Sequence, residues 1–325
     1  MKLHAKIERW PVAGAFTISR GAKTHVDVVV AEIIDGDHVG RGEGTAIYYH
    51  GESAGSVLAQ VLAQADAIDA GLTRADLQAL LPRGAARNAL DSALWDLAAK
   101  KADTPVWRLA GLPKPRPLVT AFTISLAEPA QMEADARASA HLPLLKLKLA
   151  GEGDEARVAA VRRGAPKARL IVDANEAWTG RDLAAEASTL ARYGVELIEQ
   201  PVRAGEDALL DGVQSPIPFA ADESCQDRLD LARCVGRYQA VNVKLDKTGG
   251  LTEALALAAE AKEMGLELMV GCMLATSLGI APAFLIGGLG RWVDLDGALL
   301  LAEDRPSAMQ AAQGLLEPPP PELWG

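Results

Sequence analysis

The chain has 325 residues, of which 49% are hydrophobic, so it is long enough for about two domains with substantial cores. Its formal net charge of −10 argues against nucleic acid or an anionic membrane surface as a partner. Three cysteines without a C-x-x-C pair, a charged N-terminal segment and no uncharged apolar run of bilayer length predict a soluble cytoplasmic protein.

The first third of the chain combines strand, turn and helix patterns. Residues 26–34 are rich in β-formers, and Asp35-Gly36-Asp37 directly after them predicts a tight turn. Apolar residues at three- and four-residue steps predict helices over 52–69 and 83–102. The proline-rich segment 113–117 then breaks the pattern, and we place a domain boundary there.

Short apolar runs alternate with helical patterns beyond this boundary. Strands are expected at 118–124, 144–149, 169–175, 195–201, 218–224, 240–245, 266–272 and 292–296. Eight strands separated by helices favour a closed parallel barrel, because the alternative, a doubly wound open sheet, usually has fewer strands.

Five charged residues end successive predicted strands at nearly the spacing of one strand-plus-helix unit. In chain order they are Lys148, Asp173, Glu199, Asp222 and Lys244. If the strands are parallel, all five project from the carboxyl end of the barrel, where ligand chemistry is found. The three carboxylates offer the oxygen ligands that Mg²⁺ prefers. One such acid alone would more often be a solvated loop residue, so the interpretation rests on the series.

The lysines are expected to face the barrel interior. Lys146 and Lys148 alternate with leucines, so they share one face of their strand. Lys148 and Lys244 are candidate bases, and Lys146 is expected to support Lys148 electrostatically or to contact a substrate carboxylate. Lys247 competes with Lys244, but it lies past the apparent strand end and is expected to meet solvent or the start of the next helix.

Together these residues resemble the muconate-lactonizing subgroup of the enolase superfamily. That subgroup carries a Lys-x-Lys on the second barrel strand, Asp, Glu and Asp ligands on the third to fifth, and a lysine on the sixth. The matching residues here are Lys146, Lys148, Asp173, Glu199, Asp222 and Lys244. Within the subgroup, the run Lys-Thr-Gly-Gly-Leu-Thr-Glu at 247–253 and the Asp294-x-Asp296 pair resemble the dipeptide epimerases.

The resemblance implies an α/β, enolase-like fold. An α+β capping domain (1–113, completed by the C-terminal tail 305–325) would cover a modified (β/α)7β TIM barrel (114–304). The implied reaction is Mg²⁺-dependent epimerisation of dipeptides such as L-Ala-L-Glu at their C-terminal residue. One lysine would remove the α-proton and the other would return it on the opposite face, through an enolate that the metal stabilises.

The resemblance also suggests substrate contacts. Asp294 and Asp296 are expected to hold the dipeptide ammonium, although an Asp beside Gly297 is more commonly a turn cap. Arg20 of the cap would reach an acidic side chain, unless it is simply an exposed arginine, and Thr123 is a weaker candidate contact. Asn175 and Asp246 are expected to support the metal ligands.

Three alternatives remain open at this point. An N-acylamino acid racemase or an o-succinylbenzoate synthase would share the proton-abstraction step, but neither substrate offers a free ammonium to Asp294 and Asp296. A non-catalytic barrel that binds an acidic metabolite would not need two opposed lysines. The sequence leaves a homo-oligomer open, and no partner base for Cys272 is evident.

Overall fold

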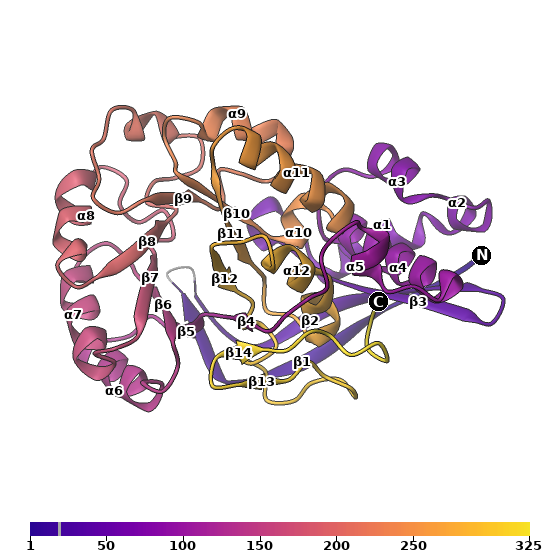
Figure 1. Cartoon of the computed structure of the whole chain (residues 1–325), viewed down its shortest axis with the longest axis horizontal. Coiled ribbons are helices and arrows are strands. Elements are labelled where there is room, and N and C mark those ends of the chain that lie inside the picture. The colour runs from indigo at the N-terminus through magenta and orange to yellow at the C-terminus, as the bar shows by residue number, and fades with distance from the viewer. Residues whose placement is uncertain (19–20) are drawn as a thin grey trace.

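The computed structural model describes residues 1–18 and 21–325, and its N-terminal part is a three-stranded antiparallel sheet (Figure 1). The strands are β1 (Lys2–Ile18), β2 (Gly21–Asp35) and β3 (His38–Thr45), with the tight turn after Asp35 as predicted. Alternate residues of β2 belong to two cores: Val29 and Ile33 face the helices of this part, while Val28 and Val30 join the core of the barrel. One face of the sheet therefore packs against its own helices and the other against the barrel, and α4 (Ala85–Ala102) also contacts the barrel directly.

Helices cover the outer face of this sheet. They are α1 (Ala54–Leu62), α2 (Ala65–Asp69), α3 (Arg74–Leu80), α4 (Ala85–Ala102) and α5 (Val106–Leu109), with the 3-10 helix η1 (Tyr48–His50) before them. The single helix predicted over 52–69 is wrong, because it is divided into α1 and α2. The prediction also missed α3, which begins with a capping box formed by Thr73 and Asp76.

Three glycines explain how α4 approaches β3. A Cβ added at Gly40, Gly42 or Gly44 would lie about 2.1–2.2 Å from a backbone carbonyl oxygen of α4. The glycines are two residues apart on a strand, so they form one bare face, and the helix packs its backbone directly against it. This G-x-G-x-G run is therefore a packing motif.

Eight parallel strands form a nearly closed barrel beside the sheet, with helices on its outside (Figure 1). In sheet order the strands are β5 (Phe122–Ile124), β6 (Leu144–Lys148), β7 (Arg169–Asp173), β8 (Val195–Glu199), β9 (Phe219–Ala221), β10 (Ala240–Val243), β11 (Glu267–Gly271) and β12 (Trp292–Asp294). The Ala121 amide donates to the Val293 carbonyl at 2.8 Å and brings the two edges together. The predicted α/β class and barrel are confirmed.

The helices of the barrel follow the strands in chain order. They are α6 (Pro129–Ala138), α7 (Asp154–Gly164), α8 (Leu183–Ala191), η2 (Asp207–Leu210), η3 (Arg228–Asp230), α9 (Leu231–Cys234), α10 (Leu245–Thr248), α11 (Leu251–Glu263) and α12 (Ser277–Gly287). The predicted strand 118–124 is wrong in one respect. Its first half, β4 (Leu118–Val119), leaves the barrel and pairs with β14 (Leu315–Leu316), which also pairs with β13 (Ala311–Ala312).

The C-terminal tail returns to the N-terminal part. The indole of Trp324 donates to the Ser92 carbonyl of α4, and Arg41 of β3 donates to two carbonyls of the tail, at Glu322 and Leu323. Among the described residues, no helix combines the length and apolarity needed to span a bilayer.

An apolar floor closes the interior of the barrel. Each strand or strand edge contributes one buried residue to it: Ala121, Leu144, Ile171, Leu197, Ala220, Ala240, Met269 and Trp292. Because side chains alternate along a strand, the next inward-facing residue lies two positions later. The character of that next layer decides what the barrel can bind.

Candidate active site

The layer directly above the apolar floor is almost entirely polar. Two positions beyond the floor residues stand Thr123, Lys146, Asp173, Glu199, Asp222, Asn242, Gly271 and Asp294. Apart from Gly271, these side chains belong to buried polar residues, so strand alternation alone turns an apolar layer into a charged one. Lys148, Asn175, Lys244 and Asp296 lie one further step toward the carboxyl end.

Lys146 is the cation at the centre of this layer. Its Nζ lies 2.5 Å from Glu199 Oε2, 2.7 Å from Asp294 Oδ2 and 3.5 Å from Asp173 Oδ2. Only 1% of the residue is exposed. This buried ammonium therefore links the carboxylates of Asp173 and Glu199 to that of Asp294.

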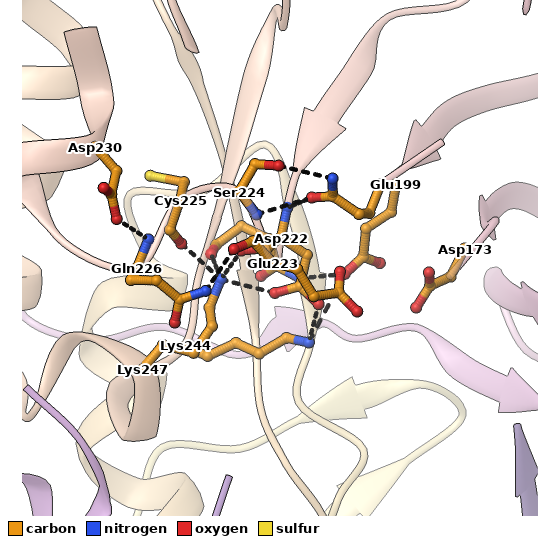
Figure 2. A network of polar contacts seen from close by, with 12 residues as sticks. Asp173, Glu199, Asp222, Glu223, Ser224, Cys225, Gln226, Asp230, Lys244 and Lys247 are labelled. Carbon is orange, nitrogen blue, oxygen red and sulfur yellow. Dashed lines mark hydrogen bonds and ion pairs between the residues drawn. The ribbon is translucent and has the colours of Figure 1, made fainter. Parts of the chain in front are cut away.

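The two candidate bases stand on opposite sides of the carboxylates. Lys148 ends β6 and lies 2.7 Å from Asp173 Oδ2. Lys244 follows β10 and lies 2.5 Å from Asp222 Oδ2 (Figure 2). Three strands separate β6 from β10 in the sheet, so the two amines approach the interior from different directions.

Burial and mutual charge perturb these groups strongly. Burial, followed by the like charges of Asp173 and Asp222, raises the pKa of Glu199 to about 7. Burial would also raise the pKa of Asp173, but Lys148, Lys146 and Lys244 lower it to about 2. Burial alone would lower the pKa of Lys146 and Lys244, but the carboxylates around them raise both pKa values well above the usual lysine range.

The carboxylates suit a hard cation in their chemistry. They offer only oxygen donors, and Glu199 Oε2 accepts no well-aligned hydrogen bond although it is buried. In the described part of the chain, no three Asp, Glu, His or Cys side chains surround one point as metal ligands do. The ammonium groups of Lys146, Lys148 and Lys244 lie among the carboxylates and balance their charge.

Asp294 and Asp296 form a second acidic pair in the same cavity. Asp296 Oδ2 accepts the Thr123 amide at 2.7 Å, while Asp294 Oδ1 is buried without a hydrogen-bond donor. Burial, followed by the charge of Asp294, raises the pKa of Asp296 to about 7. The pair therefore has unsatisfied capacity for a positive group.

Two expected supporting residues take different positions. Asn175 donates its backbone amide to Asp173 Oδ1 at 2.9 Å and lines the cavity, and its role toward the metal ligands stays a prediction. Asp246 instead accepts the Thr45 amide at 2.9 Å and the Asn88 side chain at 2.8 Å, so it connects the N-terminal sheet to the segment after Lys244.

Sequence reasoning missed two side-chain amides, one that contacts the Glu199 carboxylate and one that binds the backbone after β9. Asn242 donates to Glu199 Oε1 at 2.6 Å, and its place two residues before Lys244 was the available signal. Gln200 uses its side-chain oxygen to accept the amides of Asp222 at 2.8 Å and Ser224 at 3.1 Å. Nothing local indicated this second role, because the two segments belong to neighbouring strands.

The expectation that Lys247 meets solvent or the start of the next helix is wrong. The residue is 1% exposed and its Nζ lies 2.7 Å from Asp222 Oδ1. Lys244 lines the cavity, whereas Lys247 lies behind Asp222 and is not part of the cavity wall.

The cavity above the polar layer has a volume of about 240 Å³. The N-terminal part supplies Phe16, Lys23, Tyr48 and Tyr49 to its wall, so two regions of the chain enclose it. The predicted contact of Arg20 lies outside the described residues. Cys272 also lines the cavity, but burial and the nearby Asp296 and Asp294 raise the pKa of its thiol well above the usual range, which disfavours a thiolate.

Comparison with known proteins identifies relatives over nearly the whole chain. An L-Ala-D/L-Glu epimerase from Escherichia coli (strain K12) is 45% identical over 95% of this chain and 97% of its own length. An N-acetyl-D-glutamate racemase from Pseudoalteromonas is 42% identical over 92% of this chain and 95% of its own length.

A solved structure gives a close spatial match. It is an enolase family member from Agrobacterium tumefaciens with homology to dipeptide epimerases, bound to sodium and L-Ala-L-Glu. The two chains share 50% identity and a TM-score of 0.97, with 99% of each covered. Residues 2–111 match the N-terminal domain of mandelate racemase and muconate lactonizing enzyme, and residues 130–318 match the enolase C-terminal domain-like family. The chain therefore belongs to the mandelate racemase and muconate lactonizing enzyme family of the enolase superfamily.

Proposed function

We propose that this protein is a dipeptide epimerase that inverts the C-terminal residue of small dipeptides of the L-Ala-L-Glu type. The observation that carries the proposal is the pair of buried lysines, Lys148 and Lys244, on opposite sides of one carboxylate layer. Two amines that face one carbon from two directions allow a proton to leave on one face and return on the other. The similarity to epimerases and a racemase along the whole chain supports the same reaction class.

Asp173, Glu199 and Asp222 would hold Mg²⁺, which supplies positive charge for the substrate carboxylate as the α-proton leaves. Asn242 orients Glu199, and Asn175 orients Asp173. The ammonium of Lys146 keeps part of the negative charge of this layer neutralised, because it already contacts Glu199 and Asp173.

Asp294 and Asp296 would hold the free ammonium of the dipeptide from the β12 side of the cavity. A cation relieves the mutual repulsion of these two carboxylates in the empty site. Asp294 Oδ1 has no hydrogen-bond donor in the protein, so binding an ammonium there breaks no existing hydrogen bond. Thr123 contributes by holding Asp296 through its backbone amide. The distance between this pair and the metal ligands would then set the length of the substrate.

The N-terminal cap would close the cavity and select the side chain. We place its limits at 1–113 with the tail 305–325, and those of the barrel at 114–304. Lys23 lines the cavity from the cap side and, together with Arg20, would favour an acidic second residue. Phe16 and Tyr49 add aromatic wall and exclude water from the reacting carbon.

The similarity to an N-acetyl-D-glutamate racemase favours a second candidate, racemisation of an N-acylamino acid. Both reactions wash deuterium from D₂O into the α-carbon, so the choice of substrate separates them. L-Ala-L-Glu, N-acetyl-L-Ala-L-Glu and N-acetyl-L-Glu should be incubated with Mg²⁺ in D₂O, and α-deuteration followed by NMR.

The proposal expects exchange and inversion of the free dipeptide. N-acetylation should reduce kcat/KM by about a hundredfold, because a buried charged partner is lost. Equal rates for the free and the acetylated dipeptide would refute the proposed contact of Asp294 and Asp296 with the ammonium and would favour the racemase. A Lys148→Ala/Lys244→Ala double variant is the matched control, and any exchange that it retains is not catalysed by these lysines.

A further inference from the structure

Lys247 is an internal cation behind the carboxylate of Asp222. Its Nζ donates to the backbone carbonyls of Asp222 at 2.5 Å and Cys225 at 2.8 Å (Figure 2). It also donates to the Asn242 carbonyl at 2.9 Å. The same Nζ lies 2.7 Å from Asp222 Oδ1. A lysine ammonium has three N–H donors and no acceptor, so four oxygens around it use its full capacity.

Lys244 and Lys247 hold the same carboxylate from two sides. Lys244 directly precedes α10 and Lys247 lies one turn later, inside it. The Lys247 amide donates to the Lys244 carbonyl at 3.0 Å. Lys244 contacts Asp222 Oδ2 from the cavity, and Lys247 contacts Oδ1 from behind. Oδ1 of Asp222 therefore has an ammonium beside it but no well-aligned hydrogen bond, whereas Oδ2 faces the cavity; the hydrogen bonds of Lys247 go to the backbone carbonyls.

The carbonyls that Lys247 binds come from two neighbouring parts of the barrel. Asp222 and Cys225 lie in the loop after β9, whereas Asn242 belongs to β10 and donates to Glu199. The ammonium thus joins the segment that carries one candidate ligand to the residue that orients another. Since Lys247 is not in the cavity wall, it has no access to a substrate proton.

We propose that Lys247 is a positioning residue that fixes the loop 222–225 and presents only Oδ2 of Asp222 to a cation in the cavity. The inference rests on the proposed function, because it assigns a role toward the Mg²⁺ that Asp222 would bind. A positioning role and a purely electrostatic role of Lys247 predict opposite changes in Mg²⁺ affinity when the lysine is removed. If only charge mattered, removing either lysine would make Asp222 more attractive to Mg²⁺.

Mg²⁺ titration by calorimetry without substrate tests the proposal. The proteins compared are the wild type, Lys247→Met and the matched control Lys244→Met, which removes the same charge from the other oxygen of Asp222. Lys244→Met should bind Mg²⁺ as tightly as the wild type or more tightly. Lys247→Met should bind about tenfold or more weakly, the loss typical of groups that orient a metal ligand.

The outcomes separate this inference from the proposed function. If the wild type does not bind Mg²⁺ at this site, both fail. If the wild type binds it and Lys247→Met binds equally or more tightly, only the positioning role is overturned. Binding by Lys244→Met that is at least as tight as in the wild type, together with weaker binding by Lys247→Met, supports both; equally weakened binding by the two variants also overturns the positioning role.

A measurement on the wild type keeps the proposal open to refutation if Lys247→Met does not fold. Reductive methylation of the native protein, mapped by peptide mass spectrometry, should modify the exposed Lys167 and leave Lys247 unmodified with and without Mg²⁺. Methylation of Lys247 at the rate of Lys167 would show that its ammonium is not held by these carbonyls, and would overturn the inference.

Discussion

Replacing Lys146 by methionine should destabilise the metal-free protein strongly. Its ammonium is shared by Glu199, Asp294 and Asp173 at 2.5, 2.7 and 3.5 Å, and the residue is almost fully buried. Methionine has a similar volume, so the main effect is the loss of charge and not a cavity. Breaking a buried ion pair by removing one partner costs about 3–5 kcal/mol, because the other charge stays buried without compensation.

Urea unfolding followed by circular dichroism in EDTA at pH 7 measures this loss. We expect the free energy of unfolding of Lys146→Met to fall by about 3–5 kcal/mol. Adding Asp294→Asn to the variant should recover part of it, with a coupling of about 1–3 kcal/mol in a double-mutant cycle. Mg²⁺ at about a hundred times its dissociation constant should raise the free energy of unfolding of the variant by about 2.7 kcal/mol.

The control is Lys167→Met, which removes an exposed lysine and should change stability by less than about 0.5 kcal/mol. Two results would refute the reasoning. Either Lys146→Met unfolds at the wild-type urea concentration in EDTA, or the double variant shows no coupling with Asp294. Each would mean that the carboxylates do not depend on this ammonium.

Further measurements address the metal ligand, the bases and the interface between cap and barrel. Glu199→Gln should lower kcat/KM by at least about a hundredfold through lost electrostatic stabilisation, and equal wild-type activity in EDTA and in excess Mg²⁺ would contradict the metal assignment. Lys148→Ala and Lys244→Ala should each abolish epimerisation, while NMR should still detect α-deuterium exchange into one epimer through the remaining lysine. Burial raises the pKa of Asp91, which accepts hydrogen bonds from Thr252, from 3.8 to about 6. Because the folded-state pKa is raised, protonated Asp91 contributes to the free energy of unfolding fully below the unfolded-state pKa, and this contribution is lost as pH rises through about 6. The free energy of unfolding of the wild type should therefore fall by about 3 kcal/mol between pH 3.5 and 7 because of this site. Urea unfolding of Asp91→Asn across this range should lack that loss, and parallel curves for both proteins would contradict it.

Packing of the cap was only partly predictable. The turn at Asp35 and the helix α4 follow from local patterns, and both are found. The tight contact of α4 with Gly40, Gly42 and Gly44 could not be inferred, because a bare strand face shows nothing of what covers it. The division of the chain at residue 113 stays a prediction.

The sequence by itself determined the eight-strand barrel and the shared location of Lys148, Asp173, Glu199, Asp222 and Lys244. Side-chain alternation and the length of a strand-plus-helix unit are local properties, and they place strand-end residues at one end of a parallel barrel without any knowledge of partners.

Only the tertiary structure decided which charges meet. Lys247 follows a strand end and precedes Thr-Gly-Gly, a context typical of an exposed loop, yet it is buried because the β9 loop supplies two of its carbonyl acceptors. Gln200 likewise finds its partner after the neighbouring strand β9, and Asn242 finds Glu199 two strands away on β8. The burial of a polar side chain depends on acceptors that other segments bring to it, and no local pattern encodes those acceptors.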